Sequence, residues 1–255
     1  MIKKASKVII IIAFWILLWQ LASAIVNLPL LFPTPAGVLK KLFALMSQKA
    51  FYKSTLSSFV RILFGIMIAV IFGVFMAVVC SFSKIIYDFF IPFVTIIKST
   101  PIVAFVFLVS IFAGNEKTVI LICALMVFPI VFANVYQGLK SINVELLEFS
   151  KVYKIPFRKR LLSLYIPTVM PYFISALLSS IGLAWKAGIA AEVLCTPKIS
   201  IGIEIFNSKQ YIEYVDLFAW TLSVIVLSLA FELLITRLLK IISKKYFLTE
   251  DLHEN

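Results

Sequence analysis

Histidine is almost absent from this sequence, and charged side chains are scarce. The single histidine among the 255 residues, His253, argues against a histidine-based metal site and against a Ser-His-Asp triad. Charged residues make up 14% of the chain, against about a quarter in soluble domains, while hydrophobic residues make up 62%. Together with a mean hydropathy of +1.08, these proportions indicate a membrane protein.

Cysteine is also rare, and the acidic residues are few and scattered. Cys80, Cys123 and Cys195 lie far apart, in or beside apolar segments and without a C-x-x-C pair, which indicates small buried side chains. The formal net charge is +12. Since so apolar a chain offers no basic face for nucleic acid, we interpret the excess as a topology signal in membrane loops. An enzyme acting on lipid would need clustered acids, histidines or a nucleophile dyad, and the sequence does not support one.

The sequence contains no G-x-x-x-x-G-K-[ST] motif, and so no P-loop that could bind the phosphates of ATP. We therefore expect this chain to bind no cofactor and no metal and to have no enzymatic activity of its own. Energy for any active process would have to come from another protein.

Six apolar segments are long enough to cross a bilayer, which takes about 20 residues in a helix. The predicted spans cover residues 8–27, 62–81, 86–113, 118–138, 169–193 and 217–236. The third is predicted to be broken, because "KSTP" at 98–101 interrupts it. The uncharged run 8–32 is longer than the apolar core of a signal peptide, about 7–15 residues, so we expect a retained span. The predicted fold is an all-α polytopic membrane protein with residues 1–255 in a single domain.

The distribution of lysine and arginine predicts how these spans are oriented. With the N-terminus inside and six crossings, the inner segments hold about twice as many Lys and Arg residues as the outer segments. This bias predicts that both termini and the loop 141–168 are cytoplasmic. The segment 35–53 is too short and too charged to cross. Its apolar residues recur at helical spacing, which predicts an amphipathic helix along the outer interface.

The cytoplasmic loop 141–168 has the pattern of a helix closed at both ends. Ser141 is a possible cap for a helix over about 143–154, and Pro156 is expected to stop it. Its apolar face requires either a membrane surface or another protein as a partner. That face consists of Leu146, Phe149, Val152 and Tyr153. The five basic residues between positions 151 and 160 are expected to hold the loop inside and to meet anionic headgroups.

Here the chain resembles the permease subunits of bacterial ABC importers. Their cytoplasmic signature is Glu-Ala-Ala, three residues, Gly, nine residues, Ile, one residue, Leu-Pro. This sequence has Glu148-Phe149-Ser150, then Lys154 at the glycine position, then Pro167 at the expected spacing. The alanines and the glycine are not matched. Because a positive φ costs lysine about 1 kcal/mol, we expect Ile155-Pro156 to turn the chain in another conformation.

The resemblance extends to the nitrate/sulfonate/taurine branch of these permeases along nearly the whole chain. The similar stretches are "LFPTPAGVL", "STLSSFVRILFG", "STPIVAF", "FPIVFANVYQGLKSI" and "GLAWKAGIAAEVL". The resemblance implies a type I ABC importer permease fold in a bacterial cell membrane. It also implies that the helix at 143–154 couples the translocation path to separate ATPase subunits, which use the ATP. The implied partners are those ATPase subunits, a second permease copy in a homodimer, an extracytoplasmic binding protein and the bilayer. The implied coupling residues are Glu148, Phe149, Ser150, Val152, Tyr153, Lys154, Pro156 and Pro167.

Ionisable and polar groups at membrane depth are the candidates for the translocation path. Lys186 and Glu192 lie six residues apart, about 9 Å along a helix, so we expect no direct pair between them. Lys186 either lines the path and favours an anion, or reaches outward or to a neighbouring span. Glu192 is a possible gate or brace, and Arg61 is expected at the outer interface. The other path candidates are Ser99, Thr100, Pro101 and Asn134, although Asn134 is also expected to bond between helices.

The predicted function is the membrane-spanning subunit of an ATP-driven importer for a small anionic solute, such as a sulfonate, taurine, nitrate or a vitamin precursor. The alternative is a self-sufficient secondary transporter. That class is expected to show paired repeats with broken helices in both halves, and this sequence has one clear break. Gly65, Gly73, Gly182 and Gly188 are expected to permit close helix approach.

Overall fold

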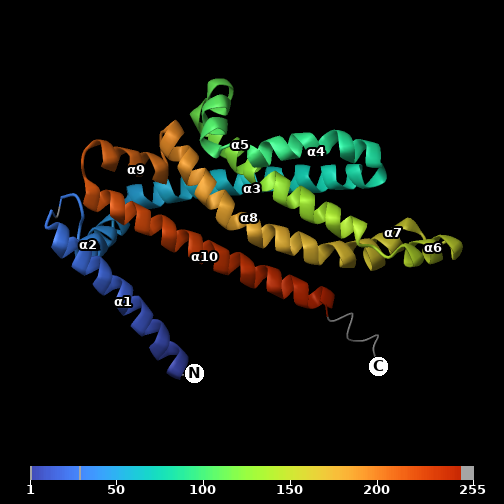
Figure 1. Ribbon diagram of the computed structural model, residues 1–255, viewed down its shortest axis with the longest axis horizontal. Helices are drawn as coiled ribbons and strands as arrows, with labels where there is room; N and C mark the ends of the chain where they lie inside the picture. The colour runs from blue at the N-terminus through green and yellow to red at the C-terminus, as the bar shows by residue number, and fades with distance from the viewer. Residues whose placement is uncertain (1, 29, 248–255) are drawn as a thin grey trace. The chain divides into compact units, whose positions relative to one another are not determined.

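The structure is a computed structural model that describes residues 2–28 and 30–247, with side chains for 10–28 and 30–239. His253 lies outside the described residues. Every regular element in the described part of the chain is helical, which confirms the all-α prediction (Figure 1). The described residues form two compact units, one within 2–58 and 196–227 and one of residues 59–195 and 228–247. Helices α3 (Lys49–Phe82) and α10 (Tyr214–Phe247) contribute residues to both.

The first unit contains α1 (Ile2–Val26), α2 (Pro35–Met46), α9 (Ile201–Gln210) and the first parts of α3 and α10. Thr34 caps α2 by accepting a hydrogen bond from the Gly37 N–H at 3.2 Å. The helix ends at Met46, and α3 begins three residues later. The prediction of one amphipathic helix over 35–53 is therefore wrong at its C-terminal end, where residues 49–53 start the long helix α3.

Aromatic and polar side chains hold the first unit together. The rings of Phe51 and Trp220 stack with their centroids 5.1 Å apart. The backbone N–H of Ile201, at the start of α9, donates to Ser58 Oγ at 2.9 Å. These contacts join the beginning of α3 to α9 and α10, so that segments far apart in the sequence share one core.

The second unit is built on two long helices, α5 (Ile102–Lys140) and α8 (Ile166–Cys195), which pack against each other. Between them lie the short helices of the connecting loop, and before α5 lies α4. Their bounds are α4 (Lys84–Ser99), α6 (Val144–Val152), α7 (Phe157–Arg160) and the π-helix η1 (Leu161–Tyr165). Figure 1 shows α6 and α7 at the end where α5 finishes and α8 begins. A kink at Gly114, with φ 71° and ψ 162°, divides α5 into two helical segments.

By length and composition, four described helices are apolar enough to cross a membrane. They cover 49–82, 102–140, 157–195 and 214–239, and a shorter apolar helix covers 10–26. The predicted third span corresponds to α4 followed by the part of α5 before Gly114. The chain breaks between these segments, since α4 ends at Ser99 and α5 begins at Ile102.

Helices α3, α5 and α8 approach closely around Cys123, which is fully buried. A Cβ added at Gly65 would lie 2.7 Å from the Ile120 carbonyl oxygen and even closer to the Cys123 side chain. One added at Gly188 would lie 2.6 Å from Ile62 Cγ1. The glycine predictions for these positions are confirmed, whereas Gly182 has no atom within 4 Å of its added Cβ and makes no such approach.

We predict that Gly65→Ala lowers the melting temperature of the purified protein, while Gly182→Ala leaves it unchanged or raises it. Forcing a methyl group into the packed site costs about 1–3 kcal/mol. At Gly182 the helix propensity of alanine adds up to about 1 kcal/mol of stability without a clash. Thermal unfolding in detergent measures both variants. A Gly65→Ala protein as stable as Gly182→Ala would contradict the close approach of α3 to α5.

Candidate functional site

The connection between α5 and α8 is an ordered helix, α6, with its own cap. Asn143 Oδ1 accepts hydrogen bonds from the N–H groups of Glu145, at 2.8 Å, and Leu146, at 3.4 Å. Glu145 lies in the first turn, where the positive end of the helix dipole stabilises a carboxylate. Ser141 is not the cap, which corrects the sequence prediction. Its hydroxyl donates to the Gly138 carbonyl at 2.9 Å and thereby helps to end α5.

The C-terminal end of α6 closes through a left-handed turn at Lys154, whose φ is 50°. The Ile155 N–H donates to the Ser150 carbonyl at 2.9 Å, and the Lys154 N–H donates to the Lys151 carbonyl at 3.0 Å. This pair of bonds is a Schellman motif, which glycine usually completes. The expectation that Ile155-Pro156 would turn the chain by another conformation is therefore wrong. Lysine adopts the glycine conformation at a cost of about 1 kcal/mol.

The outward face of α6 presents aromatic side chains. Phe149 is 52% exposed and Tyr153 is 67% exposed, and their ring centroids lie 4.3 Å apart. Val152 and Glu148 are exposed beside them. Ser150 is buried, and its hydroxyl donates to the Leu147 carbonyl at 2.7 Å. One side of α6 is therefore buried at Ser150, while the other offers an aromatic pair next to a carboxylate.

Of the two prolines of the loop, Pro156 precedes a helix and Pro167 lies inside one. Pro156 is exposed and is the residue before α7, with extended backbone angles. Pro167 is half-buried and is the second residue of α8, in a helical stretch that runs without a break from 157 to 195. Most of the basic residues on this loop are exposed, and Arg160 is half-buried.

A cluster of charges lies inside the second unit, where Arg61 joins three helices. Arg61 Nη1 donates to Glu192 Oε1 of α8 at 3.0 Å, and Arg61 Nε donates to Glu116 Oε2 of α5 at 2.7 Å. Glu192 is fully buried and the arginine side chain is 10% exposed, whereas the Glu116 side chain is 51% exposed. A buried charge has to be paired, so Arg61 and Glu192 require each other.

Local structure explains why these carboxylates need a cation to different degrees. Glu116 lies in the first turn after the Gly114 kink, where the helix dipole favours negative charge. Glu192 lies in the last turn of α8, where the dipole disfavours it. The guanidinium of Arg61 compensates the unfavourable position of Glu192. This arrangement makes Glu192 a brace between helices, one of the two roles considered from the sequence.

The sequence interpretation placed Arg61 at the outer interface without naming a partner, and the structure gives it two carboxylate partners. Glu116 was missed altogether. One signal was available, because Arg61 and Glu116 lie just before the predicted second and fourth spans and Glu192 lies at the end of the fifth, all toward the same side of the membrane. Those groups have opposite signs and are costly when unpaired.

The other path candidates bond mostly within their own helices. Asn134 Nδ2 donates to the Ile130 carbonyl of its own helix, α5, at 2.8 Å. Ser99 and Thr100, at the end of α4, both donate to the Ile96 carbonyl, at 3.2 and 2.7 Å. Pro101 is exposed and precedes α5. Lys186 is exposed on α8. Glu192 accepts its hydrogen bond from Arg61, which agrees with the sequence expectation that Lys186 and Glu192 do not pair.

We predict that Arg61→Met destabilises the protein by about 3–5 kcal/mol, because it leaves Glu192 buried without its cation. Glu116→Gln should cost less than about 1 kcal/mol, since its carboxylate is half-exposed. Denaturant unfolding in mixed micelles measures these differences. The double variant Arg61→Met/Glu192→Met should be more stable than Arg61→Met alone, and a double variant no better than the single one would contradict the pairing.

The sequence of this chain is similar to those of known transport proteins. The family model "Binding-protein-dependent transport system inner membrane component" matches residues 69–247. The permease protein SsuC of Bacillus subtilis (strain 168), whose name refers to aliphatic sulfonates, is 22% identical over 215 residues, 84% of this chain and 78% of that protein. The nitrate import permease protein NrtB of Synechococcus elongatus is 24% identical over 199 residues, 73% of this chain and 70% of the relative.

A solved structure shows the same fold. It is the crystal structure of an amino acid ABC transporter with histidines, with a TM-score of 0.60 and 15% identity over 77% of this chain and 94% of that chain. The family match and the named relatives confirm the resemblance seen in the sequence, and the apolar helices fit a multi-pass membrane protein. The chain therefore belongs to the family of binding-protein-dependent transport system inner membrane components, the permeases of ABC transporters.

Proposed function

We propose that this chain forms the translocation path of an ATP-driven importer for a small anion and that α6 is its coupling helix. The observation that carries the coupling assignment is the exposed pair Phe149 and Tyr153 on a helix fixed at both ends. Exposed aromatic residues beside a charge are typical anchors at protein interfaces. In this proposal the partner is a separate ATPase subunit. The aromatic rings enter a cleft on that subunit, and Glu148 pairs with a cation there.

The position of α6 suits the transmission of force. It follows α5 directly, and α7 and η1 then lead without a break into α8. On the side opposite the aromatic pair, Val144 and Leu147 line a cavity against α3, α5 and α8. A pull on Phe149 would therefore act on both long helices of the second unit rather than on a flexible loop.

The proposed cycle is alternating access between two permease copies. ATP binding closes the ATPase subunits, their clefts draw the two coupling helices together, and the path opens outward to a binding protein that delivers the solute. Hydrolysis resets the subunits. The orientation in this proposal places α6 and both termini in the cytoplasm, as the distribution of lysine and arginine favours. The ATPase activity then belongs to the partner subunits.

An anionic solute is supported by the exposed Lys186. It is the only basic residue in the sequence of α8, and a charge at membrane depth usually faces a protein or aqueous interior. The names of the relatives refer to aliphatic sulfonates and nitrate, which are anions. We infer that Lys186 faces the path and attracts the negative charge of the solute.

We predict that Glu148→Arg abolishes ATP-driven uptake while the protein still inserts in the membrane. The reversed charge would face a cation of the ATPase subunit and prevent docking. Uptake by cells measures transport of the solute. Co-purification of the ATPase subunit from the same cells measures docking. Glu213→Arg, the same change at an exposed acid outside the loop, is the matched control and should keep both. Wild-type uptake in Glu148→Arg would contradict the coupling assignment.

We predict that Lys186→Glu lowers solute uptake at least about tenfold, because a negative charge replaces the attraction with repulsion of an anion. ATPase co-purification should remain at the wild-type level, since α6 is unchanged. Transport kinetics in vesicles measure the loss, and Lys209→Glu, at an exposed position outside the predicted spans, controls for net charge. Unchanged kinetics would show that Lys186 is not on the path.

A further inference from the structure

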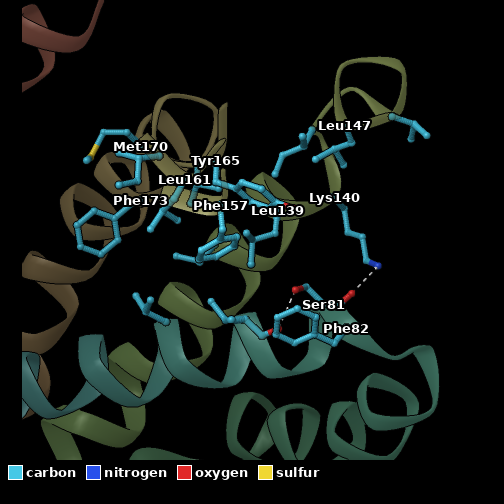
Figure 2. A pocket seen from close by; sticks show the side chains of 17 residues that line it. Ser81, Phe82, Leu139, Lys140, Leu147, Phe157, Leu161, Tyr165, Met170 and Phe173 are labelled. Atoms are coloured by element: carbon cyan, nitrogen blue, oxygen red, sulfur yellow. Dashed lines mark hydrogen bonds between the residues drawn. The ribbon is translucent and has the colours of Figure 1, made fainter. Parts of the chain in front are cut away.

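A cavity of about 640 Å³ lies between the loop that carries α6 and the ends of the long helices. Its volume is within the range of small-molecule sites, about 300–1,000 Å³. Figure 2 shows side chains from α5, η1 and α8 around it, among them Leu139, Leu161 and Phe173. Its lining is almost wholly apolar, with Ser81, Lys140 and Tyr165 as the exceptions that carry polar groups.

The cavity extends from the apolar parts of α3 and α8 to the basic loop between α5 and α8. Val74 and Val78 of α3 and Met170 of α8 belong to helices apolar enough to span a membrane, whereas Lys140 and Val144 lie at the beginning of the loop. An open apolar surface in contact with water is unfavourable by about 25 cal/mol for each Å². The shape and polarity of the cavity therefore fit an amphiphile with its tail among the helices and its head at the loop.

Lys140 is the charged residue that lines the cavity, and Arg160 lies beside the lining residue Phe157. The Lys140 ammonium reaches the Ser81 carbonyl oxygen at 3.4 Å, a long hydrogen bond, and extends to the edge of the apolar side chains (Figure 2). The Arg160 guanidinium lies 6.0 Å from the ring centroid of Phe157, which lines the cavity. Arg160 Nε is buried and has no hydrogen-bond partner among the described residues. A buried donor of this kind requires an acceptor, and a phosphate is the acceptor that an arginine suits best.

We propose that this cavity binds one anionic phospholipid. An acyl chain lies between Val78, Leu161 and Phe173, and the phosphate is bound by Lys140 and Arg160. Basic pockets between membrane helices near the cytoplasmic side are known to bind anionic lipid headgroups. A bound lipid would fill the space between α6 and the ends of α3, α5 and α8. The proposal needs neither ATP nor the transported solute and takes from the proposed function only the cytoplasmic orientation of the loop.

Native mass spectrometry of the full-length chain tests the proposal. The detergent is supplemented with equal amounts of phosphatidylglycerol and phosphatidylcholine that carry the same acyl chains. We expect one phosphatidylglycerol to be retained, with about 30-fold preference over phosphatidylcholine, as two basic contacts would give. Lys140→Gln/Arg160→Gln should remove this preference, and Leu161→Trp should reduce retention of both lipids by filling the cavity.

Two matched controls should behave as the wild type. Lys117→Gln removes an exposed charge near the start of the second segment of α5. Leu121→Trp fills a second cavity, of about 420 Å³, whose lining contains no charged residue. Equal retention of the two lipids by the wild type, or full retention by the double charge variant, would overturn the proposal. A photocrosslinker at Leu161 that captures protein instead of phospholipid in the assembled transporter would also overturn it.

Discussion

The second unit depends on the pairing of Arg61 with Glu192. A carboxylate in the last turn of α8 is unfavourable because of burial and because of the helix dipole, and the guanidinium offsets both effects. Arg61 also binds Glu116, so one side chain of α3 ties together α5 and α8. If the ends of these three helices separated, a charge would be exposed or left buried without its partner.

This pairing has a consequence at the other end of α5 and α8. From Glu116 to Lys140, α5 continues for about 36 Å at the rise of a helix, and α8 runs back along it to Glu192. The close approach at Gly65 and Gly188 leaves little room for the helices to slide. A force applied at α6 would therefore move α5 and α8 together, and the charge cluster would hold their far ends in register. Rigid packing of this kind is what the proposed coupling role of α6 requires.

Composition and local pattern were sufficient to predict the helical fold class and a helix in the loop before Pro156, and the resemblance of several stretches to known permeases identified the family. They failed where the outcome depends on contacts between distant residues. Arg61 meets carboxylates 55 and 131 positions away, and no local pattern encodes that meeting. The turn at Lys154 was mispredicted because intrinsic preference disfavours a positive φ for lysine, whereas two backbone hydrogen bonds and the start of α7 at Phe157 fix the chain there. The predicted helix over 35–53 was too long because periodicity does not mark the break at Ser47.

The charges of the second unit also bear on where an anion would be recognised. Arg61 already binds two carboxylates, which compete with an anion for its guanidinium. The basic residues of the loop lie at the end of the helices, where they suit headgroups and membrane topology rather than a path. Lys186 is then the basic residue of α8 that has neither a carboxylate beside it in the described structure nor a place on the loop. If the solute is an anion, Lys186 is the basic residue of α8 that would attract it, whereas Arg61 serves to hold α3, α5 and α8 together.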